Sequence, residues 1–249
     1  MRIVYSTSVI CSALLLVACA ESPPSQQNNI PAPIMPMPEV TVPSAAEARL
    51  GTTWGDEIQS HVSLVDLKRA STQPISTLNL NYADKAYHGN SIEAISLANG
   101  QVQLSVLGDD GRKLPLYRQN GMYYLAGKAG QSYKLYYQNG SRQTFEVIAS
   151  VDGIDVLSGQ AASRYHSGYV LYPRQSLTIA GFRKSDAAVA SFTFGKPEAS
   201  YANHSASGNI ANTGVIGSVI FVLNNPNADV KPTGSGRYAP EPDAFPADR

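Results

Sequence analysis

Apolar and polar residues alternate with a period of two through the middle of the chain, and this constrains the fold more than any other feature. The clearest runs are residues 77–82, 101–106 and 144–151, where Leu, Val, Tyr or Phe mostly alternate with Thr, Asn, Gln, Glu or Ser. Because successive strand side chains point to opposite faces, the runs predict strands with one face in a core. Residues 215–223 are almost all apolar. They favour a strand covered on both faces, with a buried helix as the alternative.

Turn dipeptides punctuate the same region. Asn-Gly or Asp-Gly stands at residues 99–100, 110–111, 120–121, 139–140 and 152–153. Both dipeptides favour the positive φ angles of tight hairpins, and residues 133–150 form the clearest predicted hairpin. We therefore predict one all-β domain over residues 51–223, an antiparallel β-sandwich or a barrel-like variant. Weak helical character is confined to residues 44–49 and 54–67.

Proline marks the ends of this domain. Of 16 prolines, seven lie between Pro23 and Pro43 and five between Pro226 and Pro246. Proline lacks a backbone donor and interrupts strand ladders, so both flanks are predicted to lie outside the sheets. We expect residues 19–50 to be a linker and residues 224–249 to be a disordered tail.

The first residues have the pattern of an export signal. Arg2 is followed by a mainly apolar stretch that is shorter than the roughly 20 residues that span a bilayer. It ends in Leu16-Val17-Ala18-Cys19, which resembles the lipobox of bacterial lipoproteins. The resemblance implies cleavage after residue 18 and acylation of Cys19, which would anchor the chain to a membrane. With Ala20 in the next position, it also implies the outer membrane; an ordinary secretory signal is the alternative.

Composition and motifs exclude several classes of function. Lys and Arg number 19, as do Asp and Glu, and no basic run occurs, which argues against nucleic-acid binding. There is no G-x-S-x-G, H-E-x-x-H, P-loop or dinucleotide fingerprint, so no cofactor or metal is expected.

The candidate acid–base residues have no catalytic spacing. No second His or Cys stands at metal-ligand spacing from His61, His88, His166 or His204. Acidic pairs occur at Asp56 and Glu57, at Asp109 and Asp110, and at Asp152 and Asp155. Turn-forming Asp accounts for most of them, and Asp155, inside an apolar segment, is expected to hold a loop.

Tyrosine and one long loop indicate where a partner could bind. The chain has 14 Tyr against 6 Phe and 1 Trp, and Tyr suits both half-exposed strands and contact surfaces. Residues 197–213 are mostly small and polar, and loops of that length are often functional. Together with residues 164–168 they form the predicted contact surface. Its candidate residues are Tyr165, His166, Tyr169, Tyr201 and His204.

Three segments of the middle region also resemble a widespread proteobacterial family with no established activity. They are residues 50–55 (LGTTWG), 151–159 (VDGIDVLSG) and 176–194, with residues 214–217 (GVIG) matching near the end. The chain departs from the family at Phe182, where Trp is usual. The resemblance implies the extent of a domain and no mechanism.

The sequence thus predicts a lipid-anchored envelope protein that is not an enzyme and binds an envelope protein or a glycan. It would face the periplasm or the cell surface. A structural subunit of a surface assembly is the second hypothesis. An enzyme that uses clustered carboxylates on envelope polymers is the third.

Overall fold

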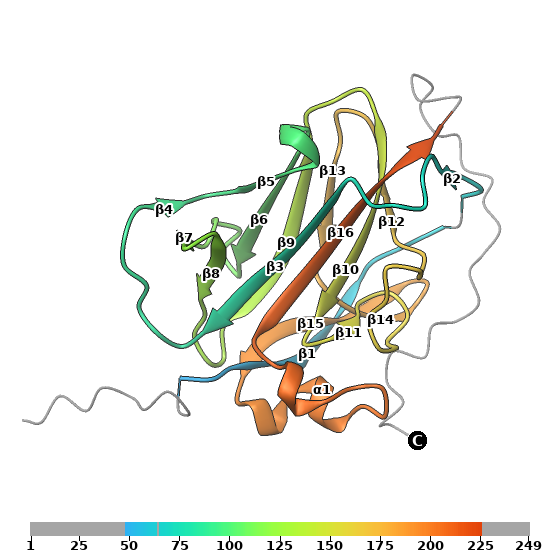
Figure 1. Cartoon of the computed structure of the whole chain (residues 1–249). Coiled ribbons are helices and arrows are strands. Elements are labelled where there is room, and N and C mark those ends of the chain that lie inside the picture. Colours follow the sequence, from blue (N-terminus) through green and yellow to red (C-terminus); the bar gives the residue numbers. More distant parts are fainter. Residues whose placement is uncertain (1–47, 64, 226–249) are drawn as a thin grey trace, which may run out of the picture. The chain divides into compact units, whose positions relative to one another are not determined.

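Two β-sheets form the molecule in the computed structural model, which describes residues 48–63 and 65–225 (Figure 1). Sheet I contains β1 (Gly51–Gln59), β5 (Ile95–Leu97), β6 (Val102–Gly108), β9 (Ser132–Asn139), β13 (Ser176–Ile179), β14 (Gly181–Ser185) and β15 (Ala188–Gly195). Sheet II contains β2 (Lys68–Arg69), β3 (Ser76–Ala83), β4 (Ser91–Ile92), β7 (Leu116–Gln119), β8 (Met122–Ala126), β10 (Thr144–Val151), β11 (Ile154–Asp155), β12 (Tyr169–Leu171) and β16 (Val215–Asn224). The predicted all-β sandwich is confirmed.

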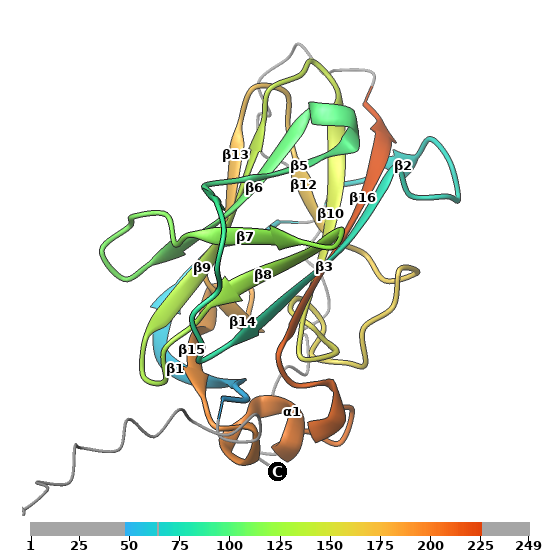
Figure 2. The same ribbon diagram turned by 60° about the vertical axis from the view of Figure 1, so that its left-hand side comes forward.

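Short helical turns occupy some of the connections. They are η1 (Ala98–Gly100), η2 (Pro197–Ala199), α1 (Tyr201–His204) and η3 (Ile210–Asn212). The last three lie in the 197–213 loop, which closes one end of the sandwich (Figures 1 and 2). At α1 the Ser200 side chain accepts a hydrogen bond from the Asn203 amide, which satisfies a free donor of the first turn.

The strand order explains how the core is enclosed. Sheet I runs β1-β15-β9-β6-β5 and sheet II runs β11-β10-β16-β3-β8-β7-β4. Every pairing between these strands is antiparallel except that of β3 with β8, which is parallel. Side chains from both sheets make one core cluster, with Leu104, Leu135 and Phe192 from sheet I against Leu80 and Val147 from sheet II.

The alternating runs lie where the sequence placed them. In β3, Leu78, Leu80 and Tyr82 are buried, while Thr77 and Asn79 are exposed. The 215–223 strand is confirmed as β16, but it alternates between buried and half-buried positions. Only its second half is covered on the outer face, because the Arg69 guanidinium lies 4.0 Å from the centroid of the Phe221 ring.

Two predictions about local structure are wrong. β9 and β10 do not form a hairpin, since they belong to different sheets and the chain crosses between the layers at residues 140–143. In place of a two-residue turn, the Asn139 side-chain amide donates to the carbonyls of Gln143 and Tyr172. Residues 54–59 are part of strand β1 and not a helix. The Asn-Gly at 120–121 does form a tight hairpin, with φ of 50° and 79°.

Several sequence expectations fall outside the described residues. These are the signal at 1–18, the acceptor Cys19, most of the 19–50 linker and all but two residues of the 224–249 tail. Within residues 48–63 and 65–225 no helix has the length and apolarity needed to traverse a bilayer.

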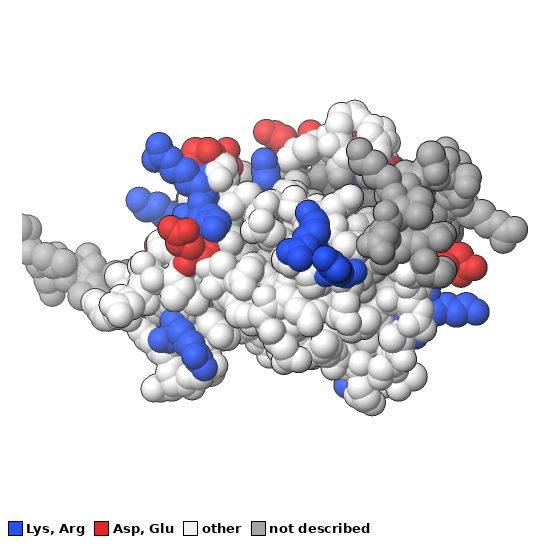
Figure 3. All heavy atoms as spheres, turned by 90° about the horizontal axis from the view of Figure 1, so that it is seen from above, with Lys and Arg blue, Asp and Glu red and all other residues white. Residues whose placement is uncertain are grey.

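On the face seen in Figure 3, acidic and basic side chains are interspersed and much of the surface is uncharged.

Candidate functional site

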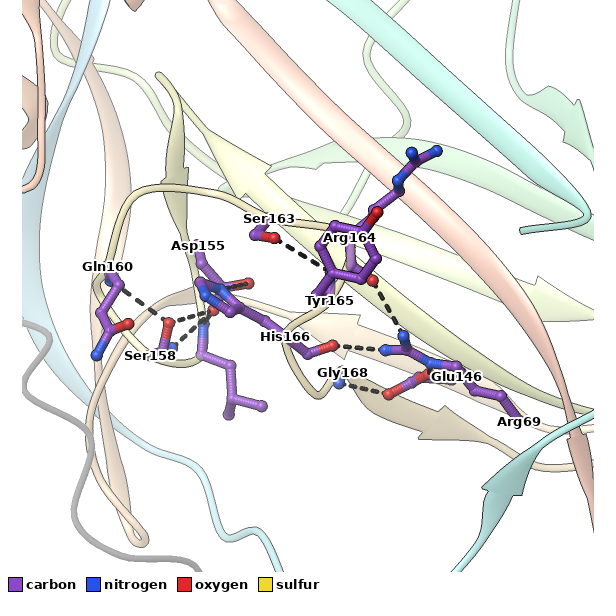
Figure 4. Close-up of polar contacts among 11 residues, drawn as sticks. Arg69, Glu146, Asp155, Ser158, Gln160, Ser163, Arg164, Tyr165, His166 and Gly168 are labelled. Atoms are coloured by element: carbon purple, nitrogen blue, oxygen red, sulfur yellow. Dashed lines mark hydrogen bonds and ion pairs between the residues drawn. The ribbon is translucent and has the colours of Figure 1, made fainter. Parts of the chain in front are cut away.

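The connection between β11 and β12, residues 156–168, is the region where the structure concentrates polar contacts (Figure 4). Its base is held by Asp155, whose side chain is 1% exposed. One carboxylate oxygen, Oδ1, accepts from the amides of Leu157 (3.0 Å) and Ser158 (2.7 Å) and from the Ser158 hydroxyl (2.9 Å). The expectation that Asp155 is a buried, hydrogen-bonded residue holding a loop is confirmed.

A single ion pair holds the far end of the loop, and we call it the Arg69–Glu146 clamp. Arg69 Nε lies 2.5 Å from Glu146 Oε2, and the two side chains are 23% and 11% exposed. The two remaining guanidinium nitrogens of Arg69 donate to the carbonyls of Arg164 (3.0 Å) and His166 (2.5 Å). The other Glu146 oxygen accepts from the Gly168 amide at 2.8 Å. Charge-assisted bonds of this kind are shorter and stronger than neutral ones.

Gly168 lets the loop return close to the sheet. A Cβ atom at this position would collide with the carbonyl of Val147 in β10 and lie 2.9 Å from a side-chain carbon of Ile148. The close approach covers the outer face of β10, and therefore Ile148 and Glu146 are buried although the alternation places them away from the core.

Arg164, Tyr165 and Ser167 are exposed to solvent, and we call residues 163–167 the tip. Tyr165 is 76% exposed, and the Arg164 guanidinium lies 5.4 Å from the centroid of its ring. His166 turns inward, so that its Nδ1 atom is buried and lies 3.7 Å from Asp155 Oδ2, which is beyond hydrogen-bond distance. The tip thus presents a cation and an aromatic ring from a backbone fixed on both sides.

A buried arginine lies beneath the loop. Arg183 in β14 is 2% exposed and donates to the Ser60 hydroxyl at 3.1 Å and to the Tyr169 hydroxyl at 3.3 Å. It also donates to the carbonyl of Ser60. Burial raises the pKa of Tyr169, the positive charge of Arg183 opposes that shift, and the negative charge of Asp155 adds to it. Because the net shift raises the pKa from an ordinary value of 10.0, Tyr169 remains a neutral phenol at physiological pH.

The five predicted contact residues separate into two groups. Tyr165 and His166 lie on the 156–168 loop (Figure 4), and Tyr169 is the first residue of β12, directly after this loop. Tyr201 is fully buried, packed against Phe182 at 4.6 Å between ring centroids, so its place on a contact surface is corrected to a place in the core. His204 is exposed, and the centroid of its ring lies 6.5 Å from the centroid of the Trp54 ring.

The turn before β11 lies close to the 197–213 loop. A Cβ atom on Gly153 would lie 2.8 Å from the side-chain amide nitrogen of Asn212 in η3. Arg49 fastens this loop by donating to Thr213 Oγ1 at 3.1 Å.

Asp152 belongs to a different network, which connects the two sheets. Its carboxylate accepts from the Thr52 amide (2.6 Å), the Tyr82 hydroxyl (2.6 Å) and the Gly214 amide (2.8 Å). Tyr82 gives its hydrogen to Asp152, so the Thr52 hydroxyl donates to Tyr82 and accepts from Tyr133. Asp152 does occupy a turn, with a φ of 54°, but its side chain reaches distant segments and not the local backbone that its turn position predicted. Burial raises the pKa of Asp152 to about 6, although the bonds from Tyr82 and the amides lower it.

The polar groups of the 156–168 loop stabilise structure in the arrangement observed. Ser158, Asp155 and His166 are the residue types of a hydrolytic triad, but in a triad the imidazole lies between the hydroxyl and the carboxylate. Here the Ser158 hydroxyl bonds the carboxylate directly. In the described part of the chain, no group of three or more His, Cys, Asp or Glu side chains is placed to hold a metal ion.

Sequence reasoning missed Arg69, Glu146 and Arg183. Glu146 carried a signal, because it is the one charged residue in the otherwise apolar or neutral 144–151 run. Arg69 and Arg183 carried none, since their partners lie 77 and 123 residues away.

Comparisons with protein-family models, curated proteins and solved structures found no match to this chain.

Proposed function

We propose that this protein is a lipid-anchored component of the bacterial cell envelope whose β-sandwich is a non-catalytic module that binds an envelope protein or glycan. The anchor part of the proposal is supported by the sequence around Cys19, and the resulting location is the outer membrane. The module would face the periplasm or the cell surface.

The observation that supports binding is the combination of a tightly held loop backbone with an exposed Arg164-Tyr165 pair. Three polar bonds from the Arg69–Glu146 clamp end on the loop backbone at Arg164, His166 and Gly168. A fixed backbone that displays Tyr and Arg reduces the ordering cost of association, and these residue types dominate many protein contacts.

The non-catalytic part rests on how the buried carboxylates are used. Asp152 and Asp155 are each 1% exposed and accept bonds from backbone amides and hydroxyl groups. A carboxylate engaged in this way holds loops and sheets together, and these two supply no solvent-facing acid–base pair.

Palmitate labelling of the full-length chain in a Gram-negative host tests the anchor. We expect label on the wild-type protein and its complete loss in Cys19→Ser, which would leave the membrane fraction. Cys11→Ser is the matched control and should keep the label, because residue 11 precedes the predicted cleavage site. Labelling that survives in Cys19→Ser would contradict the proposed anchor.

Zero-length cross-linking in the same cells tests the binding function, and it should give a discrete complex that contains the wild-type chain. The absence of both a cross-linked complex and binding to purified envelope polysaccharide would contradict the proposed binding function.

A further inference from the structure

Tyr165 is unusually open to solvent for a residue on a well-held backbone. Tyr165 is 76% exposed, a larger exposed fraction than that of any other large hydrophobic residue in 48–63 and 65–225. Met122 follows at 50%. Trp54, at 39%, is by comparison flanked by the Tyr201 ring at 5.5 Å. Exposing an aromatic ring this far leaves its apolar surface in water and gains no burial energy within the monomer.

The backbone on both sides of Tyr165 is held by one guanidinium. Arg69 bonds the carbonyl before the ring, at Arg164, and the carbonyl after it, at His166. Arg69 is itself fixed by Glu146 and by the Phe221 ring beneath it. The tip is therefore ordered before any partner arrives, which lowers the entropy cost of docking.

The charges around the tip leave one cation for a partner. Arg69 is neutralised by Glu146, and the Asp155 carboxylate is buried against Ser158 and His166. Arg164 is exposed, and within the described residues no ion pair involves it. Figure 4 shows its guanidinium pointing away from the clamp.

We infer, on the basis of the proposed binding function, that the tip docks onto a protein partner. The Tyr165 ring would enter an apolar pocket of that protein, and Arg164 would pair with a carboxylate at the rim of the pocket. Charge complementarity selects an acidic surface. A protein is favoured over a glycan because the tip is an exposed projection, whereas small ligands are usually held in concave sites. Anchoring aromatic and Arg residues typically dominate such contacts.

The test places a photo-cross-linking amino acid at exposed Ser167 in the full-length chain, in living cells. This position leaves Arg164 and Tyr165 intact, and the same probe at Met122 on β8 is the matched control. We expect a cross-link from position 167 to one protein, at a segment that mass spectrometry maps beside an Asp or Glu. Its yield should fall about tenfold in Arg164→Glu and in Tyr165→Ala, and should be largely kept in Arg164→Lys and Tyr165→Phe.

A charge exchange completes the experiment. Replacing the mapped carboxylate of the partner by Lys should restore cross-linking to Arg164→Glu. A cross-link to polysaccharide or lipid, an unchanged yield in Arg164→Glu, or no cross-link from position 167 would overturn the inference. If zero-length cross-linking gives a discrete protein complex and position 167 captures nothing, the proposed binding function survives and the tip assignment fails. If zero-length cross-linking gives no complex, purified envelope polysaccharide is not bound and position 167 captures nothing, both fail.

Discussion

Two buried carboxylates, one within β10 and one directly after it, hold very different parts of this molecule. Asp152, just after β10, bonds Thr52 of sheet I and Tyr82 of sheet II, so it connects the two layers. Glu146, within β10, bonds Arg69 and the Gly168 amide, so it holds one loop against one sheet. The first network lies in the core and the second at the surface. The difference indicates that removing Asp152 should destabilise the whole domain, whereas removing Glu146 should release only the 156–168 loop.

Asp152→Ala is the change expected to have the largest effect. It leaves the buried Thr52 amide, the buried Tyr82 hydroxyl and the half-buried Gly214 amide without their acceptor, and each buried group left so costs about 1–3 kcal/mol. We expect the free energy of unfolding to fall by about 4 kcal/mol, as measured by urea denaturation of a soluble Cys19→Ser form. Asp152→Asn keeps an acceptor and should lose less. Equal stability of Asp152→Ala and the parent would refute the bridging role.

The pH dependence of stability is the next largest expected effect. The pKa of Asp152 is raised by burial from 3.8 to about 6 in the folded state, so the folded protein holds this proton more tightly than the unfolded chain. The resulting stabilisation is fully present below pH about 4 and is lost as the pH rises to about 6, a change of about 3 kcal/mol. Subtracting the profile of Asp152→Asn from that of the parent should isolate this decline. A difference profile that is flat or rises with pH over this window would contradict a raised pKa of Asp152 in the folded state.

Glu146→Gln should give the smallest change in global stability and a clear local one. Loss of the charge weakens the bonds to Arg69 and Gly168, and hydrogen bonds to charged groups contribute about 1.5–3 kcal/mol. We expect amide hydrogen exchange in residues 163–168 to accelerate about tenfold, while exchange in β16 changes little. Tyr165→Ala serves as the control, because truncating an exposed ring should alter neither quantity. Uniform acceleration over the whole sheet would show that the clamp is not local.

The sequence was most informative where a pattern acts over a few residues. The alternation of residues 77–82 predicted which side chains of β3 are buried, because side-chain direction along a strand has a period of two. The turn at Asn120-Gly121 followed from the preference of this dipeptide for positive φ. Asp155 was recognised as a loop-holding residue from its position within an apolar segment.

The sequence was least informative where the outcome depended on distant segments. The dipeptide at 139–140 looked like a hairpin turn, but the Asn139 side chain bonds the carbonyl of Tyr172, 33 residues away, and the chain passes to the other sheet. Tyr201 was expected at a surface because its neighbours are small and polar, yet contact with Phe182 buries it. Neither contact leaves a trace in the local pattern.

The sequence by itself determined the strand-rich character of the middle of the chain and most of its buried faces, because backbone geometry makes these local properties. It also carries the lipobox pattern at Cys19, from which the anchor is proposed. Only the tertiary structure decided which strands share a sheet, which carboxylate bridges the layers and which loop is held rigid. Arg69 reaches Glu146 across 77 residues of sequence, and an ion pair over that separation exists only once the folded chain has brought the two strands together.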